Sequence, residues 1–287
     1  MKLLDSISTY TTPYTNYEME DKSPLGDTIT FLGTAGARIM VANQILASGG
    51  LWLSLSGTEI LIDPGPGCIV QSTKRKLRAN KLSAIILSHR HLDHSADANI
   101  MVEAMTQGGL KQRGWLFAPA DALETEPVIF SYLRNYLNGI EVLQEGKTYS
   151  VGNISFSTPI RHIHRVETYG MLFKTAGHTF SYIADSGYFD DLCRSYGGEL
   201  LIINVVFLKP HSPAENPSLP IDHLSVPDAE HIIKELKPKV AILTHFGMTM
   251  WRAKPWEIAQ RLSQETGVKV IAARDGMRFD LSQLGNV

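Results

Sequence analysis

Short apolar runs, bounded by glycine, proline or polar clusters, recur along most of the chain. Such runs predict buried β-strands, whereas helical spacing of apolar residues predicts amphipathic helices. Strands are expected within residues 28–32, 49–55, 59–63, 82–87, 115–119, 141–144, 148–151, 154–159, 180–187, 200–206, 240–248 and 268–277. Helices are expected at residues 95–105, 229–236 and 255–266.

The turns between these runs predict how the strands pair. Ser56-Gly57-Thr58 separates two runs as a hairpin turn would, and Glu145-Gly146-Lys147 separates two others. Such hairpins favour mainly antiparallel sheets with helices outside them, which is an α+β fold. Gly33-Thr34-Ala35-Gly36-Ala37 follows the first strand as a tight turn, or as a glycine-rich loop that could hold phosphate.

The chain has 287 residues, of which 44% are hydrophobic, so it can bury a substantial core. We expect a single domain spanning residues 1–287, with the polar residues 1–26 as an extended lead-in. The formal charge of −2 provides no general attraction to nucleic acid. No apolar run is long enough to span a bilayer, and the first residues lack the apolar stretch of a signal peptide. Cys68 and Cys193 are too few for a disulfide framework, which favours a cytoplasmic protein with free thiols.

The most informative stretch is Ser88-His89-Arg90-His91-Leu92-Asp93-His94, in which four metal-binding side chains follow a buried strand. Imidazole and carboxylate suit zinc, iron or manganese. His89 and His91 alternate and can face one side of an extended chain, whereas Asp93 and His94 can point to a second position, so two metals are indicated. The alternative is a polar loop whose histidines only cap the next helix, and the number of ligands in this spacing counts against it.

This motif resembles the signature of the metallo-β-lactamase superfamily. Phe31-Leu32-Gly33-Thr34-Ala35-Gly36 is similar to the opening of its ribonuclease Z-like branch, which is close to the cyclic phosphodiesterases. The resemblance implies a four-layer αβ/βα sandwich, with two mainly antiparallel mixed sheets, outer helices and a binuclear metal site at one edge of the sheets. It also implies that three later segments supply the remaining ligands.

The resemblance assigns ligands for two divalent cations, with zinc expected and manganese or iron as alternatives. One cation is expected at His89, His91 and His164. The other is expected at Asp93, His94 and His245. Asp185, at the end of a predicted strand, is expected to bridge the two cations.

Two further residues are expected to support these ligands. Asp63 ends a predicted strand and can hydrogen-bond a ligand imidazole, although it also suits a turn before Pro64-Gly65. His162 lies two residues before His164, and alternation would place both on one strand face. In the family the third ligand precedes a glycine-containing strand by six residues, and counting back from Gly170 gives His164. His162 is therefore assigned a supporting or packing role.

His223-Leu224-Ser225 resembles the His-Ser-Thr element of the same branch, whose histidine donates a proton to the leaving group. The expected catalytic residues are then Asp93, Asp185 and His223. In the alternative interpretation Ser225 is only a helix N-cap, with Asp228 three residues later, and His223 merely precedes it.

The resemblance implies hydrolysis of a small or cyclic phosphodiester, with a hydroxide bridging two metals as the nucleophile. Asp185 stands where many lactamases of the superfamily have cysteine, and His91 stands where the di-iron branch has glutamate. The interval from Gly170 to Asp185 leaves no room for the long arm of true ribonuclease Z enzymes. The alternatives are a hydrolase of a carboxylic ester, lactone or thioester, and a non-catalytic metal or ligand sensor.

The expected partner is a small anionic substrate rather than a long RNA or a membrane, and the question of a homo-oligomer is left open. Arg161, Arg165 and Lys174 lie near the third ligand in sequence and could bind a substrate anion, although each of them singly suits a solvated surface better.

Overall fold

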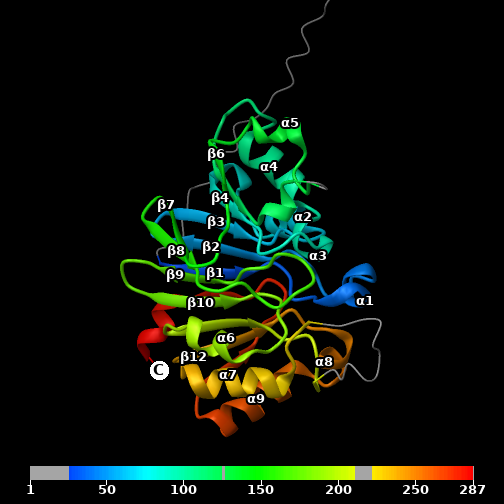
Figure 1. Ribbon diagram of the computed structural model, residues 1–287, viewed down its shortest axis with the longest axis vertical. Coiled ribbons are helices and arrows are strands. Elements are labelled where there is room, and N and C mark those ends of the chain that lie inside the picture. The colour runs from blue at the N-terminus through cyan, green and yellow to red at the C-terminus, as the bar shows by residue number, and fades with distance from the viewer. Residues whose placement is uncertain (1–25, 125–126, 211–221, 287) are drawn as a thin grey trace, which may run out of the picture.

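The computed structural model describes residues 26–124, 127–210 and 222–286. Two seven-stranded sheets pack face to face, and helices cover the outer side of each (Figure 1). This arrangement confirms the αβ/βα sandwich expected from the sequence. The lead-in expected for residues 1–26 lies outside the described residues except for its last position. The assignment of residues 1–287 to one domain stays a prediction.

The first sheet has the strand order β14-β1-β2-β3-β4-β5-β6. Its strands are β1 (Thr28–Phe31), β2 (Leu51–Leu55), β3 (Thr58–Ile62), β4 (Leu82–Ile86), β5 (Trp115–Ala118), β6 (Gly139–Val142) and β14 (Arg278–Asp280). The pairings from β14 to β3 are antiparallel and those from β3 to β6 are parallel. The chain thus returns after more than 200 residues to place β14 beside β1.

The second sheet has the order β13-β12-β11-β10-β9-β8-β7. Its strands are β7 (Lys147–Val151), β8 (Ile154–Thr158), β9 (Met171–Lys174), β10 (Thr179–Ile183), β11 (Leu200–Asn204), β12 (Val240–Thr244) and β13 (Lys269–Ala272). The pairings from β7 to β10 are antiparallel and those from β10 to β13 are parallel. Both sheets are mixed, and in the described residues parallel pairing is as frequent as antiparallel pairing.

Helices form two outer layers, one over each sheet (Figure 1). Over the first sheet lie α2 (Cys68–Lys74), α4 (Ala98–Thr106) and α5 (Ser131–Arg134), and over the second lie α6 (Asp190–Ser195), α7 (Val226–Leu236) and α9 (Pro255–Thr266). The short helices α1 (Ala37–Ala42), α3 (Leu92–Ser95) and α8 (Met248–Arg252) follow strand ends, and α1 contacts both others. Ser225 and Asp228 form the capping box that begins α7, which confirms the expected N-cap.

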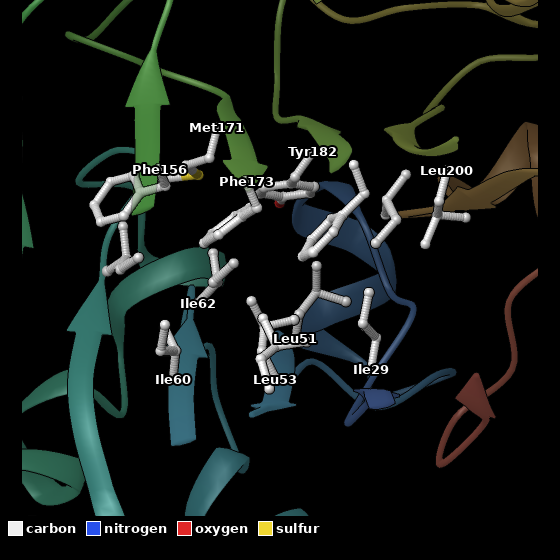
Figure 2. Packing of buried hydrophobic residues seen from close by; sticks show 14 of the residues in the cluster. Ile29, Leu51, Leu53, Ile60, Ile62, Phe156, Met171, Phe173, Tyr182 and Leu200 are labelled. Atoms are coloured by element: carbon white, nitrogen blue, oxygen red, sulfur yellow. The ribbon is translucent and has the colours of Figure 1, made fainter. Parts of the chain in front are cut away.

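The main core lies between the two sheets. Alternate residues of β1, β2 and β3 point inward and meet aromatic residues of the second sheet, as Figure 2 shows for Ile29, Leu51, Ile62, Phe173 and Tyr182. Because strand side chains alternate between faces, the opposite faces of the same strands pack against the helices in two smaller cores. The sandwich therefore fixes the strand ends rigidly where loops emerge.

One expected hairpin is wrong. Residues 141–144 and 148–151 do not pair around Glu145-Gly146-Lys147, because β6 belongs to the first sheet and β7 to the second. Leu143 is fully buried in the core between the sheets at this point. The segment carries the chain from one sheet to the other, and a turn-like sequence cannot distinguish that crossing from a hairpin.

Candidate metal centre

The motif after β4 lies at one end of the sandwich, as its place after a buried strand predicts. His89 and His94 are buried, and His91 and Asp93 are partly buried. Helix α3 begins directly after His91, so Asp93 and His94 belong to its first turn. The expected helix 95–105 is divided, because α3 ends at Ser95 and α4 begins at Ala98. The short helix points Asp93 and His94 away from the extended residues before it.

The first group of ligand atoms comes from His89, His91 and His164, which lie within 4.8 Å of one another. Nε2 of His164, from the segment between β8 and β9, lies 3.1 Å from Nδ1 of His91. The other ring nitrogen of His164 is 3.0 Å from the carbonyl oxygen of Asp222. A ligand histidine commonly donates its second N–H to a carbonyl, which fixes the ring and its tautomer.

The second group comes from Asp93, His94, Asp185 and His245, again within 4.8 Å. Asp185 follows β10 and His245 follows β12, so two strands of the second sheet deliver them. Nε2 of His245 lies 3.5 Å from Oδ2 of Asp93, and its Nδ1 lies 3.4 Å from Oδ1 of Asp185. Both sheets therefore contribute to this group.

Asp185 reaches both groups. Its Oδ2 lies 3.3 Å from Nε2 of His94 and 3.9 Å from Nε2 of His89. The carboxylate thus stands at the position from which it could contact two neighbouring cations. That it bridges two ions stays a prediction, as does the ligand set as a whole.

The donor atoms suit divalent cations. Nε2 of His89, Nε2 of His94 and both ring nitrogens of His245 are buried and have no hydrogen-bond partner within the described structure. Unpartnered buried polar atoms are costly, and a cluster of them aimed at common points is what a cation would satisfy. Imidazole nitrogen with carboxylate oxygen is the donor set of zinc and related metals.

The ionisation states of the first ligand group and of Asp185 favour the same conclusion. Burial lowers the pKa of His89 well below its usual value and lowers that of His91 to about 4, so both imidazoles are neutral at neutral pH. Burial alone would raise the pKa of Asp185, but the histidines around it, His245 foremost, override this and lower it. Neutral imidazoles beside an ionised carboxylate are the forms that bind metal.

His94 differs from His89 and His91 in its ionisation. Burial opposes the charged ring, but the carboxylates of Asp185, Asp93 and Asp63 outweigh burial and raise the pKa of His94 well above its usual value. A cation must therefore displace a proton from His94.

Asp63 organises the floor of this centre. Its carboxylate accepts hydrogen bonds from the backbone N–H and the hydroxyl of Ser88, each at 2.7 Å. It also lies 3.0 Å from Nδ1 of His94. Asp63 has a positive φ of 53°, a strained conformation for a residue other than glycine, directly after the end of β3. Asp63 therefore lies beside the ring of a candidate ligand, and its supporting role stays a prediction.

Two supporting residues were missed by sequence analysis. The Tyr182 hydroxyl donates to Oδ2 of Asp63 at 3.0 Å, and the Asn204 amide donates to Oδ1 of Asp185 at 2.8 Å. Burial and the nearby Asp63 carboxylate raise the pKa of Tyr182, which keeps the phenol protonated as a donor. The signal for Asn204 was present, because it is a polar residue inside an otherwise apolar run. Tyr182 gave no such signal, since tyrosine is ordinary in a buried strand.

His162 and His164 have different environments. His162 is buried, with Nδ1 3.1 Å from the carbonyl oxygen of Asp185 and Nε2 2.8 Å from the Tyr196 hydroxyl. Both of its ring nitrogens thus have protein partners, one of which is the backbone of Asp185. His164 presents Nε2 to His91, as described above. The geometry agrees with a supporting role for His162.

His223 lies beside the second group. Its Nδ1 is 3.4 Å from Oδ2 of Asp185, and its ring centre is 5.2 Å from that of His164. Burial lowers the pKa of His223 to about 4, although the Asp185 carboxylate opposes this. His223 precedes the Ser225 N-cap of α7, so the capping interpretation and a position in the site are both compatible with the structure.

The glycine turn after β1 supports His245. A Cβ atom on Gly36 would lie 2.2 Å from the carbonyl oxygen of His245 and 2.3 Å from its Nδ1. The Gly36 N–H donates to the carbonyl of Phe246, and the Phe246 N–H donates to that of Thr34. Glycine is therefore required here for close backbone approach, which is the tight-turn alternative of the sequence analysis.

The cationic residues expected near the third ligand have exposed side chains. Arg161, Arg165 and Lys174 are all exposed, and Lys174 lies at the end of β9 remote from Gly170.

Cys68 and Cys193 are buried free thiols outside both ligand groups. None of the described helices is long and apolar enough to cross a membrane.

Comparison with known families identifies this arrangement. A family model described as a beta-lactamase superfamily domain matches residues 58–246, which is more than half of the chain. The chain belongs to the beta-lactamase superfamily. The matched range contains the candidate ligands from both sheets, from His89 to His245. The resemblance noted in the sequence is thereby confirmed at the level of the family.

Two relatives within the superfamily are similar over most of their length. The uncharacterized protein MJ1374 of Methanocaldococcus jannaschii is 30% identical over 263 residues, which cover 88% of this chain and 94% of that protein. The probable metallo-hydrolase YhfI of Bacillus subtilis is 27% identical over 220 residues, which cover 76% of this chain and 86% of that protein.

Solved structures of the superfamily share the fold. The crystal structure of YhfI from Bacillus subtilis superimposes with a TM-score of 0.73 at 23% identity, covering 89% of this chain and 99% of that one. A diphosphatase from the PhnP family superimposes with a TM-score of 0.64 at 19% identity, covering 88% and 97%. At these identities the likeness shows the fold alone.

Proposed function

We propose that the protein is a metal-dependent hydrolase that cleaves a small or cyclic phosphodiester at a binuclear centre. The observation that supports this most strongly is the position of Asp185, whose Oδ2 lies within 3.9 Å of ligand atoms from both groups and 3.4 Å from His223. A carboxylate shared between two donor groups, with an imidazole beside it, suits two cations and a proton donor. Membership of the beta-lactamase superfamily and the likeness to a probable metallo-hydrolase support hydrolysis.

The candidate residues would hold two cations and keep the ligands in position. His89, His91 and His164 would hold one cation, and Asp93, His94 and His245 the other, with Asp185 contributing to both. Zinc is the metal we expect first, with manganese or iron as alternatives. When bound, such cations polarise the scissile group and lower the pKa of a coordinated water. Asp63 and Asn204 would keep His94 and Asp185 in position through their hydrogen bonds.

His223 would deliver the proton to the leaving oxygen. In the absence of substrate its pKa is lowered to about 4, chiefly by burial, so the ring is neutral at neutral pH. A phosphodiester carries a negative charge, and an anion beside an imidazole favours the protonated ring. An anionic substrate would therefore raise the pKa of His223 and help to load the acid, whereas an uncharged ester would not.

The short segment between the candidate ligands His164 and Asp185 favours a small substrate. Strands β9 and β10 form a hairpin joined by residues 175–178, so this segment carries no long arm that could hold an RNA. The overall charge of −2 agrees with a small ligand. The similar fold of a diphosphatase from the PhnP family supports chemistry on phosphate esters.

The free thiols of Cys68 and Cys193 support a cytoplasmic location.

A carboxylic ester, lactone or thioester is the second candidate. Leu92, between two candidate ligands, is 77% exposed, and Ile163, beside the third-ligand histidine, is 49% exposed. Large apolar side chains exposed beside a catalytic centre suit an acyl chain better than a phosphate. Ring opening of a lactone also depends less on a protonated His223 than expulsion of an alkoxide from phosphorus does.

One experiment separates these candidates. Metal content is measured on the purified protein, and hydrolysis of bis-p-nitrophenyl phosphate, a lactone and a thioester is followed after loading with zinc or manganese. Asp185→Ala and His223→Ala are compared with His231→Ala, which changes an exposed histidine on α7. About two metals per chain, with diester cleavage lost only in the first two variants, is the expected result.

The other outcomes are equally informative. Two metals with turnover of only the lactone or the thioester, indifferent to His223→Ala, would establish the second candidate. Two metals with no turnover of any of the three substrates would favour a metal-binding sensor. Failure to bind metal after loading would overturn the assignment of the centre itself.

A further inference from the structure

A second concave surface lies on the outer face of the first sheet, remote from the metal centre. It is an open cavity of about 860 Å³, bounded by the beginnings of β1, β3 and β4, the turn between β2 and β3, and the end of α2. Ligand-binding cavities for small molecules span about 300 to 1,000 Å³. The cavity therefore has the size of a metabolite site.

The strand directions separate this cavity from the metal centre. Glu59, near the start of β3, lines the cavity, whereas Asp63, just after the end of β3, lies in the metal centre. Strand geometry places the two residues roughly 13 Å apart. Strand β4 repeats the pattern, because Ser83 lines the cavity and His89 follows the strand end. The two sites lie at opposite ends of the same strands.

The floor of the cavity is polar. Thr28, Thr30 and Ser54 alternate with inward-facing apolar residues on β1 and β2, so their side chains point to the outer face. The hydroxyl groups of Thr28 and Thr30 therefore line the cavity, whereas the Ser54 hydroxyl donates to Glu59.

Positive charge dominates the wall. The cationic lining residues are Arg75, Lys76, Arg78, Lys81, Arg113 and Arg278, and the acidic ones are Asp27 and Glu59. This local surplus contrasts with the formal charge of −2 of the whole chain. Six cations converging on one cavity produce a potential that attracts anions.

The two carboxylates accept hydrogen bonds from neutral groups. Oε2 of Glu59 accepts hydrogen bonds from the Trp52 ring N–H and the Ser54 hydroxyl, and Oδ1 of Asp27 accepts one from the Ser56 N–H. Among the described residues, no ion pair of 4.0 Å or less is formed by Arg75, Lys76, Lys81, Arg113 or Arg278. These five cations therefore line the cavity without an acidic partner among the described residues.

We propose that this cavity binds a small polyphosphate anion, either inorganic or carried by a nucleoside. Several phosphate groups in one short ligand match several cations around one small volume, and the hydroxyls of Thr28 and Thr30 can donate to phosphate oxygens. Binding here is independent of the function proposed for the metal centre, because no candidate ligand lines the cavity.

Calorimetric titration of the purified protein with tripolyphosphate and with ATP tests the proposal. Lys76→Glu/Lys81→Glu reverses two exposed charges of the wall. Lys237→Glu/Lys269→Glu is the matched control, since both residues are exposed outside the cavity and Lys237 shares the left-handed backbone of Lys76. The wall variant should lose more than about tenfold in affinity, because two attractions become repulsions. The control variant should bind as the wild type does, and neither should alter hydrolysis at the metal centre.

Each result has a defined meaning. Equal affinity for tripolyphosphate and ATP would show recognition of the phosphate chain, and tighter binding of ATP would add the nucleoside. Lys81→Gln/Arg278→Gln, which only removes charge, tests the same wall should the reversal prevent folding. The proposal is overturned if neither anion binds at about 0.1 M salt, if the wall variants bind unchanged, or if only a short single-stranded RNA binds in a wall-dependent way.

Discussion

Tyr182 and Asp63 meet across the two sheets, and the Tyr182 hydroxyl donates to the Asp63 carboxylate at 3.0 Å although 119 residues separate them. Tyr182 lies on β10 of the second sheet, and Asp63 follows β3 of the first. Since Asp63 also contacts the ring of His94, this hydrogen bond connects the packing of the sheets to the geometry of the metal centre.

Tyr182→Phe should therefore affect metal binding as well as stability. Loss of the buried hydrogen bond is expected to lower the free energy of unfolding by about 1 to 3 kcal/mol. Metal affinity should fall by about 10- to 100-fold, since Asp63 would no longer be fixed beside His94. Tyr149→Phe is the matched control, because its hydroxyl bonds to the backbone of Val142 outside both ligand groups. Urea unfolding and competition with a metal indicator would measure the two effects, and equal metal affinity in both variants would contradict the expectation.

Gly36→Ala should displace His245. The added methyl group would lie 2.2 Å from the His245 carbonyl oxygen, so the backbone must shift. We expect about 1 to 3 kcal/mol of destabilisation and loss of one bound metal. Gly177→Ala, with no atom within 4 Å of its added Cβ, is the control and should change stability by no more than about 0.5 kcal/mol. Metal analysis of the two variants decides the question, and full metal content in Gly36→Ala would exclude the proposed contact.

Addition of metal should stabilise the folded chain. Buried nitrogens of His89, His94 and His245 have no partner in the described structure, and a bound cation would satisfy them only in the folded state. Zinc at about 100 times its dissociation constant should contribute about 2.7 kcal/mol per site, which corresponds to a Tm increase of several degrees. Differential scanning fluorimetry with zinc and then with a chelator would show a reversible shift. His245→Ala should reduce the shift, and His231→Ala should preserve it.

His162 should make stability depend on pH. Burial lowers its folded-state pKa to about 4 from the ordinary value of 6.5, so between these values the unfolded chain binds a proton that the folded chain excludes. Stability contributed by neutral His162 is fully present above pH 6.5 and is lost as the pH falls towards 4. The loss amounts to about 3 kcal/mol at most. The sign follows from the greater proton uptake of the unfolded state as pH falls.

Comparison of the wild type with His162→Gln isolates this contribution, because the other buried histidines titrate in both proteins. The difference in the free energy of unfolding should be largest at pH 7 and should shrink towards pH 4. Urea unfolding at a series of pH values would measure it. A difference that stays constant across that range would show that His162 does not titrate as expected.

The sequence predicted the elements that depend on local patterns. Helix α9 matches its expected bounds, and the motif from His89 to His94 lies at the expected strand end. Such features follow from residue spacing alone, because strand and helix periods are local. The resemblance to the superfamily supplied the long-range part, including the choice of His164 over His162.

Other features depend on contacts that no local pattern encodes. Tyr182 has the composition of a core residue, and only the docking of the second sheet brings its hydroxyl to Asp63. The crossing between β6 and β7 has the residues of a hairpin turn, and the identity of the partner strands decides its role. The need for glycine at position 36 depends on the approach of His245, which is 209 residues away in the sequence.

The return of β14 to β1 has a consequence for the timing of folding. Asp275, just before β14, accepts hydrogen bonds from the backbone and hydroxyl of Thr34 and from the N–H of Ala47, and so holds the turn that contains Gly36. A chain emerging from the ribosome has made all the candidate ligands before it has made Asp275. The centre can therefore reach its final shape only after synthesis has passed residue 280, and until then β1 offers an unpaired edge to neighbouring chains.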